Sequence, residues 1–317
     1  MIVSFKNAIE IFQSSIRFFL RYPISIFPLI LCWCIYAPII LYLEFYMNWD
    51  AFNASEIFGI VFLIYFVFSF IIGTSCLILL EIVQQVESGK RPKLSKALKD
   101  CFFRDLIKAL PVLIIWSIIW SILALLEAIL SKKKDENDRK EKELTAKSAA
   151  KTLAGVKKES SLINSFFSAL KKGLRMIVFI ILPAVAWEEL GPIRAIKKGL
   201  TVLRSTIPEF ITGYALTRVF VAIVILPVAI IFYIDSEFSV VFPEFVWYFV
   251  LVYIAFSWSI SFLVEQLYVA ELYLWHIKWE DEYKTAKEEG KELPTLRGTP
   301  KPSFFDEDNS LKTHLHM

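Results

Sequence analysis

Residues 245–264 read FVWYFVLVYIAFSWSISFLV and contain no charged side chain. A helix needs about 20 apolar residues to cross the roughly 30 Å hydrocarbon core of a bilayer, so this stretch predicts a membrane span. Further uncharged runs precede it along the chain, at 22–43, 57–80, 109–126, 176–187 and 219–234. Together they predict an all-α fold, a polytopic membrane helix bundle with about six spans.

The composition of the chain agrees with a membrane protein. Hydrophobic residues make up 56% of the 317 residues and charged residues 21%, whereas soluble domains average about 45–50% and about 25%. A net charge of +3 is too small to predict a nucleic-acid partner. Three of the four cysteines lie inside apolar runs, which argues against a disulfide framework. The sequence matches no catalytic, metal or cofactor motif, so we expect no enzymatic activity, metal or cofactor.

The run at 176–187 is the shortest and contains Pro183. Extended back to Leu162 it reaches membrane length, but it then includes Lys171, Lys172 and Arg175. Basic side chains near a helix end can extend to the headgroups, which permits a full span. A re-entrant segment is the alternative, both for 162–187 and for 106–130.

Three basic stretches precede pairs of apolar runs. In each, an alanine followed by Ile or Leu stands 13 to 15 residues before a proline: Ala8 and Pro23, Ala97 and Pro111, Ala195 and Pro208. The first stretch has an apolar stripe at helical spacing, which predicts an amphipathic helix lying at the interface: Phe5, Ala8, Ile9, Phe12, Ile16 and Phe19. Because proline breaks a helix before it, each unit is a basic interfacial helix, a proline corner and a helical hairpin.

These units predict three pseudo-repeats at about 1–92, 93–190 and 191–279, which together form the membrane-embedded domain. A charged insert at 131–161 interrupts the second hairpin, and its composition predicts a mobile, solvated segment, either helical or disordered. Residues 280–317 predict a polar cytoplasmic tail that begins as a short charged helix and continues into disorder.

A glutamate follows the second apolar run of each hairpin: Glu81, Glu188 and Glu271. One interpretation is that these residues simply end their helices at the membrane interface. The other is that three acidic groups converge on a pseudo-symmetric axis and serve a function.

Two charges adjoin the last pair of apolar runs. Arg218 immediately precedes 219–234 and Glu265 immediately follows 245–264, so a tight hairpin brings them level. A charge inside a bilayer pairs with another or lines water, which predicts an Arg218–Glu265 ion pair. The pair is either a structural clamp or part of an ion or solute path. Arg175 and Glu127 are a further candidate pair.

Positive charge marks the cytoplasmic side of membrane proteins. The loops 44–56 and 235–244 carry only acidic charges, whereas the three basic helices share the other side. We therefore expect a multi-pass cell-membrane protein with both termini in the cytoplasm. The insert, which begins with three lysines at 132–134, conflicts with this pattern. Six spans place it outside, and re-entrant segments leave it inside.

The basic helices also supply candidate contacts for anionic lipid headgroups: Lys96, Lys99, Arg194, Lys197, Lys198 and Arg204. The lipid bilayer is thus the expected partner. A homo-oligomer or an unknown protein partner is also compatible with the sequence.

Two stretches carry a resemblance to a known family. Residues 183–199 read PAVAWEELGPIRAIKKG, and the N-terminal stretch has Phe5-x-x-Ala8-Ile9-x-x-Phe12 followed by the corner at Pro23. They resemble the YciC-like family of uncharacterised prokaryotic inner-membrane proteins. The resemblance covers most of the membrane domain and implies an integral membrane protein of about six helices, without an established activity.

Two classes of function follow from these observations. One is a structural, interaction or lipid-organising membrane protein that acts through its basic helices. The alternative is a transporter or channel for a small solute or ion, with a path between the hairpins. A lipid-modifying enzyme ranks third, because the sequence contains no nucleophile–base pattern.

We predict that single cysteines at Asn48 and Ser236 react with a membrane-impermeant thiol reagent on whole cells, whereas one at Ser310 reacts only after permeabilisation. The native cysteines would first be replaced. Equal reaction at Asn48 and Ser310 in whole cells would disprove the proposed orientation.

Overall fold

The computed structural model describes residues 2–131, 144–154, 162–238 and 241–301, all of which form helices and their connections. This confirms the predicted all-α fold. The helices of 19 or more residues are α1 (Ile2–Arg21), α2 (Phe27–Phe45), α3 (Ala54–Glu87), α5 (Leu106–Ser131), α7 (Leu162–Ala186), α9 (Ile207–Glu237) and α10 (Glu244–Glu288). The shorter elements are η1 (Pro23–Ile26), η2 (Trp49–Ala51), α4 (Leu94–Asp100), η3 (Cys101–Asp105), α6 (Ala146–Leu153) and α8 (Pro192–Ser205).

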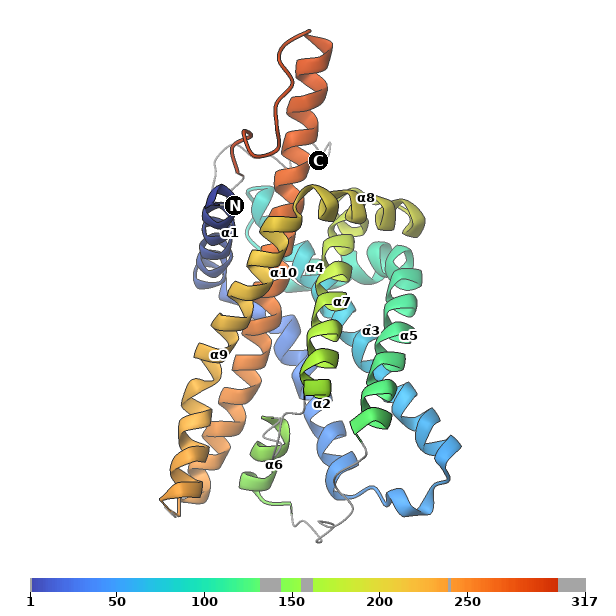
Figure 1. The fold of residues 1–317 in the computed structure, drawn as a ribbon, viewed down its shortest axis with the longest axis vertical. Coiled ribbons are helices and arrows are strands. Elements are labelled where there is room, and N and C mark those ends of the chain that lie inside the picture. Colours follow the sequence, from blue (N-terminus) through green and yellow to red (C-terminus); the bar gives the residue numbers. More distant parts are fainter. Residues whose placement is uncertain (1, 132–143, 155–161, 239–240, 302–317) are drawn as a thin grey trace.

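The helices form one bundle whose chain passes repeatedly between two ends (Figure 1). The helices α1, α4 and α8 lie at the same end, which we call the basic end, and α6 lies at the opposite, far end. The helices α2, α5 and α9 lead away from the basic end, and α3, α7 and α10 return to it. The order of basic helix and hairpin thus occurs three times, and a common origin of the three units stays a prediction.

Five helical segments are long and apolar enough to cross a membrane: 23–45, 55–87, 94–127, 207–237 and 244–288. The chain is accordingly a multi-pass helical protein. The count of six is not confirmed, because α7 carries Lys171, Lys172 and Arg175 in its middle. Both α5 and α7 are continuous helices (Figure 1). For both segments, the full span and the re-entrant segment considered above stay predictions.

The proline corners are present in two of the three units. Pro23 begins η1 and Pro208 lies in the first turn of α9, where the missing amide hydrogen costs nothing. The prediction is wrong at Pro111, which lies inside α5. There, α4 continues through the π-helical turn η3 directly into α5. At this point the regular α-helix is interrupted by the extra residue of a π-helical turn and not by a proline.

The three repeated alanines are the points where the basic helices contact the bundle. Ala8, Ala97 and Ala195 are all fully buried. The apolar stripe expected on α1 is only partly its buried face, because Phe5 is half exposed. Instead α1 packs on α9 and α10 through small and polar side chains mixed with apolar ones: Ser4, Asn7, Ala8, Ile11, Ser14, Ser15 and Phe18. Membrane helices often associate through small residues, which leaves large apolar side chains for the lipid.

The described part of the insert is a packed helix at the far end. Helix α6 begins with a capping box at Thr145 and buries Ala146 and Ala150 against α2 and α10. The ammonium of Lys147 lies 2.6 Å from the carboxylate of Asp235, at the end of α9. This part of the insert therefore lies with the loop at 235–244, as six spans require. The insert's first lysines, at 132–134, lie outside the described residues.

The expectation of a disordered tail is wrong as far as residue 301. Helix α10 continues to Glu288, and Gly290 then adopts a φ of 65°, which reverses the chain. The segment 291–301 returns along α10, where Trp275 donates a hydrogen bond to the carbonyl of Thr299 (3.1 Å). Arg297 also lies 3.1 Å from the fully buried carboxylate of Glu209. Residues 302–317, with Ser310, lie outside the described residues.

Close contact between α9 and α10 depends on a glycine. A Cβ atom at Gly213 would lie 2.0 Å from the ring of Tyr268, which is fully buried. The hydroxyl of that tyrosine donates a hydrogen bond to the carbonyl of Glu209 (2.6 Å), so the ring has no room to move.

We predict that Gly213→Ala lowers the thermal unfolding midpoint in detergent, because overpacking a filled core typically costs about 1–3 kcal/mol. Gly59→Ala is the matched control: a Cβ there meets nothing within 4 Å, and alanine favours a helix by about 1 kcal/mol. A Gly213→Ala protein as stable as the control would show that the helices can separate at this point.

Candidate functional site

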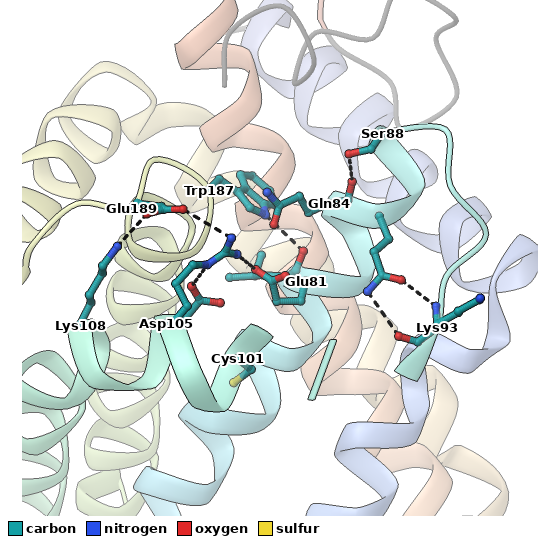
Figure 2. Close-up of polar contacts among 12 residues, drawn as sticks. Glu81, Gln84, Ser88, Lys93, Cys101, Asp105, Lys108, Trp187 and Glu189 are labelled. Carbon is teal, nitrogen blue, oxygen red and sulfur yellow. Dashed lines mark hydrogen bonds and ion pairs between the residues drawn. The ribbon is translucent and has the colours of Figure 1, made fainter. Parts of the chain in front are cut away.

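A charged cluster lies at the basic end, where α3, η3 and the α7–α8 connection meet (Figure 2). The guanidinium of Arg104 contacts three carboxylates: Glu81 at 2.7 Å, Asp105 at 2.9 Å and Glu189 at 3.4 Å. Lys108 lies 2.9 Å from Glu189 and completes the cluster. One arginine thus connects the first hairpin to both ends of the second.

Local structure places each of these side chains. The turn η3 carries Arg104 and Asp105 towards the last turns of α3. Glu189 has a φ of 52°, rare for a residue with a side chain, in the link that ends α7 before Gly191 and Pro192. Trp187 anchors the same link, because its indole donates a hydrogen bond to the carbonyl of Leu80 (3.2 Å).

Two carboxyl groups in this cluster are removed from solvent. The side chains of Glu81 and Asp105 are 3% and 0% exposed, against 34% for Arg104. One carboxyl oxygen of Asp105, Oδ2, has no hydrogen-bond partner among the residues that the structure describes. Two buried carboxylates and one guanidinium leave a local excess of negative charge, which a proton or a bound cation would relieve.

Glu189 is the half-exposed member of the cluster. The hydrogen bond from Lys108 lowers the pKa of its carboxyl group. A lowered pKa means that this contact contributes stability above the ordinary pKa of glutamate and loses it as the pH falls through the lowered value. The contribution is small, because solvent screens an exposed pair.

A cleft of about 80 Å³ adjoins the cluster between α3 and α4, lined by Glu81, Gln84, Gln85, Ser88, Lys90, Lys96, Asp100 and Arg104. Figure 2 shows three of these lining residues, Glu81, Gln84 and Ser88, at the end of α3. The amide of Gln85 bonds both backbone groups of Lys93 and so holds the start of α4. The described residues contain no His, Cys, Asp and Glu group suited to a metal ion. The cleft can hold water or a small polar group.

A second charged cluster lies deeper in the bundle. Glu265 on α10 is almost completely buried and contacts two cations of α7, Lys172 at 3.0 Å and Arg175 at 2.6 Å. Arg175 also lies over the ring of Phe262, at 4.1 Å from the ring centroid. Lys171, on the same helix, pairs with Glu127 of α5.

These contacts correct both predicted ion pairs. Arg218 is exposed on α9 and forms no ion pair with a described residue, whereas Glu265 takes its cations from α7. The Arg175–Glu127 candidate is corrected in the same way, because the partner of Glu127 is Lys171. The sequence argument considered only the hairpin containing Glu265 and overlooked the neighbouring α7.

The three glutamates predicted to follow the hairpins, Glu81, Glu188 and Glu271, lie towards the basic end. Glu81 pairs with Arg104, and Glu188 accepts a hydrogen bond from Tyr273 and lies 3.9 Å from Lys198. Glu271 is buried on α10. Glu81 and Glu188 each have their own cation on a later basic segment, an arrangement that favours the structural interpretation over a shared acidic centre.

The candidate lipid contacts separate into two kinds. Lys96, Lys99, Arg194, Lys197 and Arg204 are exposed. Lys198 is the exception: its side chain is 16% exposed and pairs with Glu280 of α10. Neighbouring lysines on α8 therefore face solvent and protein respectively.

Sequence reasoning missed Asp105, the partners of Glu189 and the role of Lys172. Asp105 had a signal, since it directly follows Arg104 at the start of an apolar run. Glu189 and Lys172 had none, because their partners are distant in the sequence: the cations of Glu189 lie at the start of the same hairpin, and Glu265, the partner of Lys172, lies in the next hairpin. Only the packing of α7 brings them together.

Comparison with known proteins connects part of the chain to a family. Residues 143–281 match a family described as a family of unknown function (DUF6159). The match covers the second half of the second hairpin and the whole third unit. No curated protein and no solved structure matches the chain. The resemblance to YciC-like proteins is not supported by these comparisons and stays a prediction.

We predict that Arg104→Gln lowers the free energy of unfolding by about 3 kcal/mol, because it leaves two buried carboxylates without their cation. Thermal unfolding in detergent measures the change. The double variant Arg104→Gln with Glu81→Gln should recover part of the loss. Arg91→Gln is the control, since Arg91 is exposed at the same end. Equal stability of Arg104→Gln and the control would mean that the cluster does not join the hairpins.

Proposed function

We propose that this protein organises anionic lipid at the cytoplasmic face of a prokaryotic cell membrane, without enzymatic activity. The observation that carries the proposal is the composition of the surface at the basic end. Exposed cations there alternate with large exposed apolar side chains, as in helices that lie in a membrane interface. A multi-pass protein with such a rim gathers lipid around a rigid body.

Helix α8 shows the pattern most clearly, and it lies across the end of the bundle (Figure 1). Ala195, Gly199 and Val202 are buried, and a Cβ at Gly199 would lie 2.7 Å from Ile181 of α7. The opposite face exposes Ile193 (70%), Arg194 and Lys197. One face thus packs on the bundle, while the other presents apolar and cationic groups to headgroups and acyl chains.

The neighbouring turn η3 adds to the same rim. Phe102 and Phe103 are 50% and 78% exposed, beside the exposed Lys96 and Lys99 of α4. Phenylalanine side chains beside lysines are typical of helices that lie at the boundary between headgroups and hydrocarbon. Because positive charge marks the cytoplasmic side, the rim supports a cytoplasmic basic end and cytoplasmic termini.

The centre of the bundle also favours a structural role over transport. Large side chains fill it, and Trp116, Phe179, Leu263 and Tyr268 are all at most 1% exposed. Two hollows among the described residues lie at the basic end, one beside Glu81 and one beside the extended end of α10. A packed centre supports the role of a scaffold.

We predict that the triple variant Arg194→Gln, Lys197→Gln and Arg204→Gln copurifies with less anionic phospholipid, relative to zwitterionic phospholipid, than the wild type. Each cation near an anionic surface contributes about 1 kcal/mol. Lipid extraction and mass spectrometry measure the ratio. Lys198→Gln is the control, because it removes one positive charge of α8 that is already paired with Glu280 inside the protein. An unchanged ratio in the triple variant would exclude the proposal.

One observation favours transport as the second candidate. Glu265 and its two cations form a charged group within the bundle, and such groups can mark solute or ion paths.

If this cluster lines a path, Glu265→Gln should abolish a flux that wild-type protein produces in liposomes. Glu237→Gln, at the far end of α9, is the control. The absence of flux with wild-type protein would exclude the transport candidate for the ions or solutes tested.

A further inference from the structure

The deeper charged cluster is not neutral. The described residues of this cluster place three cations of α7, namely Lys171, Lys172 and Arg175, against two carboxylates, those of Glu127 and Glu265. Arg218 of α9 adds a fourth cation, because it directly follows Thr217, whose hydroxyl lies 3.2 Å from the ammonium of Lys172. Both carboxylates are occupied by cations of α7. Arg218 forms no ion pair with a carboxylate of the described residues. An uncompensated cation in an apolar environment calls for an anion from outside the protein.

Arg218 lies on the exposed surface of α9, beside apolar side chains. Ile211 (61% exposed) lies two turns before it on the same face, and Val219 (59%) and Ile223 (62%) lie further round the helix. Arg218 lies eleven residues after Ile207, which is about 16 Å along the helix from its start at the basic end. This is deeper than the headgroup level marked by α8. The long side chain of Arg218 covers only part of the distance to the headgroups.

Lys172 lies on the neighbouring helix α7, and its ammonium has one N–H donor that is not used in a contact with a described residue. It contacts Glu265 (3.0 Å) and Thr217 (3.2 Å) and lies over the ring of Tyr214, 4.9 Å from its centroid. Two of its three N–H donors are thus assigned. The side chain is 15% exposed, so the polar bridge between α7 and α9 is accessible from outside.

We propose that Arg218 and Lys172 bind a phosphate group within the membrane, between α7 and α9, and that the group belongs to a phospholipid of the leaflet at the basic end. A phosphate offers several acceptor oxygens to an arginine fork and a lysine ammonium together. The exposed apolar side chains above and below Arg218 suit the acyl chains. The lipid enters from the side and is drawn below the surface of its leaflet.

This site differs from the lipid contacts on α4 and α8, and it rests on the proposed function only for the choice of ligand. Surface cations act on the net negative charge of a headgroup. The site at Arg218 binds the phosphate itself, so it accepts zwitterionic and anionic phospholipids alike. Free inorganic phosphate has the same chemistry but lacks acyl chains.

The test counts tightly retained phospholipids on the purified full-length chain by native mass spectrometry. The chain is first reconstituted in bilayers of phosphatidylcholine and phosphatidylglycerol and then extracted. Arg218→Gln should lose one retained phospholipid, with retention falling about tenfold or more. Arg218→Lys, which keeps the charge, should retain it. Arg204→Gln is the matched control, because it removes an exposed arginine of α8, and it should also retain this lipid.

Two results would overturn the proposal. Arg218→Gln protein that keeps the same number of retained phospholipids would exclude the site. Displacement of the retained lipid by added inorganic phosphate would reassign the site to a free anion. A failure of the proposed function has a different signature: the triple variant of α8 then keeps its anionic lipid, while Arg218→Gln still loses its phospholipid.

Discussion

Burying an unpaired charge in an apolar bundle is costly, and this cost fixes the position of α7. Since α7 is the second helix of the second hairpin, the position of that hairpin follows from it. Three cations lie in the middle of this helix, and two of them find a fully buried carboxylate, Glu265, on α10. The third finds Glu127 on α5. Each pairing requires α7 to lie between those two helices, where it also packs on α3. A buried ion pair adds little net stability, but removing one partner is costly because it leaves an unpaired buried charge. The pairs therefore specify the position of α7 more than they stabilise the fold.

The same principle operates at the basic end. Arg104 joins α3 to the second hairpin, Lys198 joins α8 to α10, and Arg297 joins the returning C-terminal segment to α9. These contacts connect elements that do not follow one another in the chain. The cations that make no such contact, as on the outer face of α8, are the ones available to lipid. Burial thus sorts the basic residues into structural and lipid-facing groups.

Much of the fold was predictable. Uncharged runs predicted the long helices, because a bilayer requires a minimum apolar length. The spacing of Ala8, Ala97 and Ala195 before apolar runs predicted three helices at one end, and these alanines are their buried contact points. One error arose because apolar periodicity was interpreted as burial. In a membrane protein the exposed surface is apolar too, so the stripe on α1 that includes Phe5 does not indicate its packed face.

The sequence by itself determined which segments are helical, which end of each hairpin carries positive charge and which residues are charged within apolar surroundings. Those properties depend on composition and local spacing. Only the tertiary structure decided the partners: Glu265 with α7 instead of Arg218, Lys198 with Glu280 instead of lipid, and the return of 291–301 onto α10. The physical reason is that a charge pairs with whatever lies within a few ångströms. That distance is set by how the helices pack and not by their order in the chain.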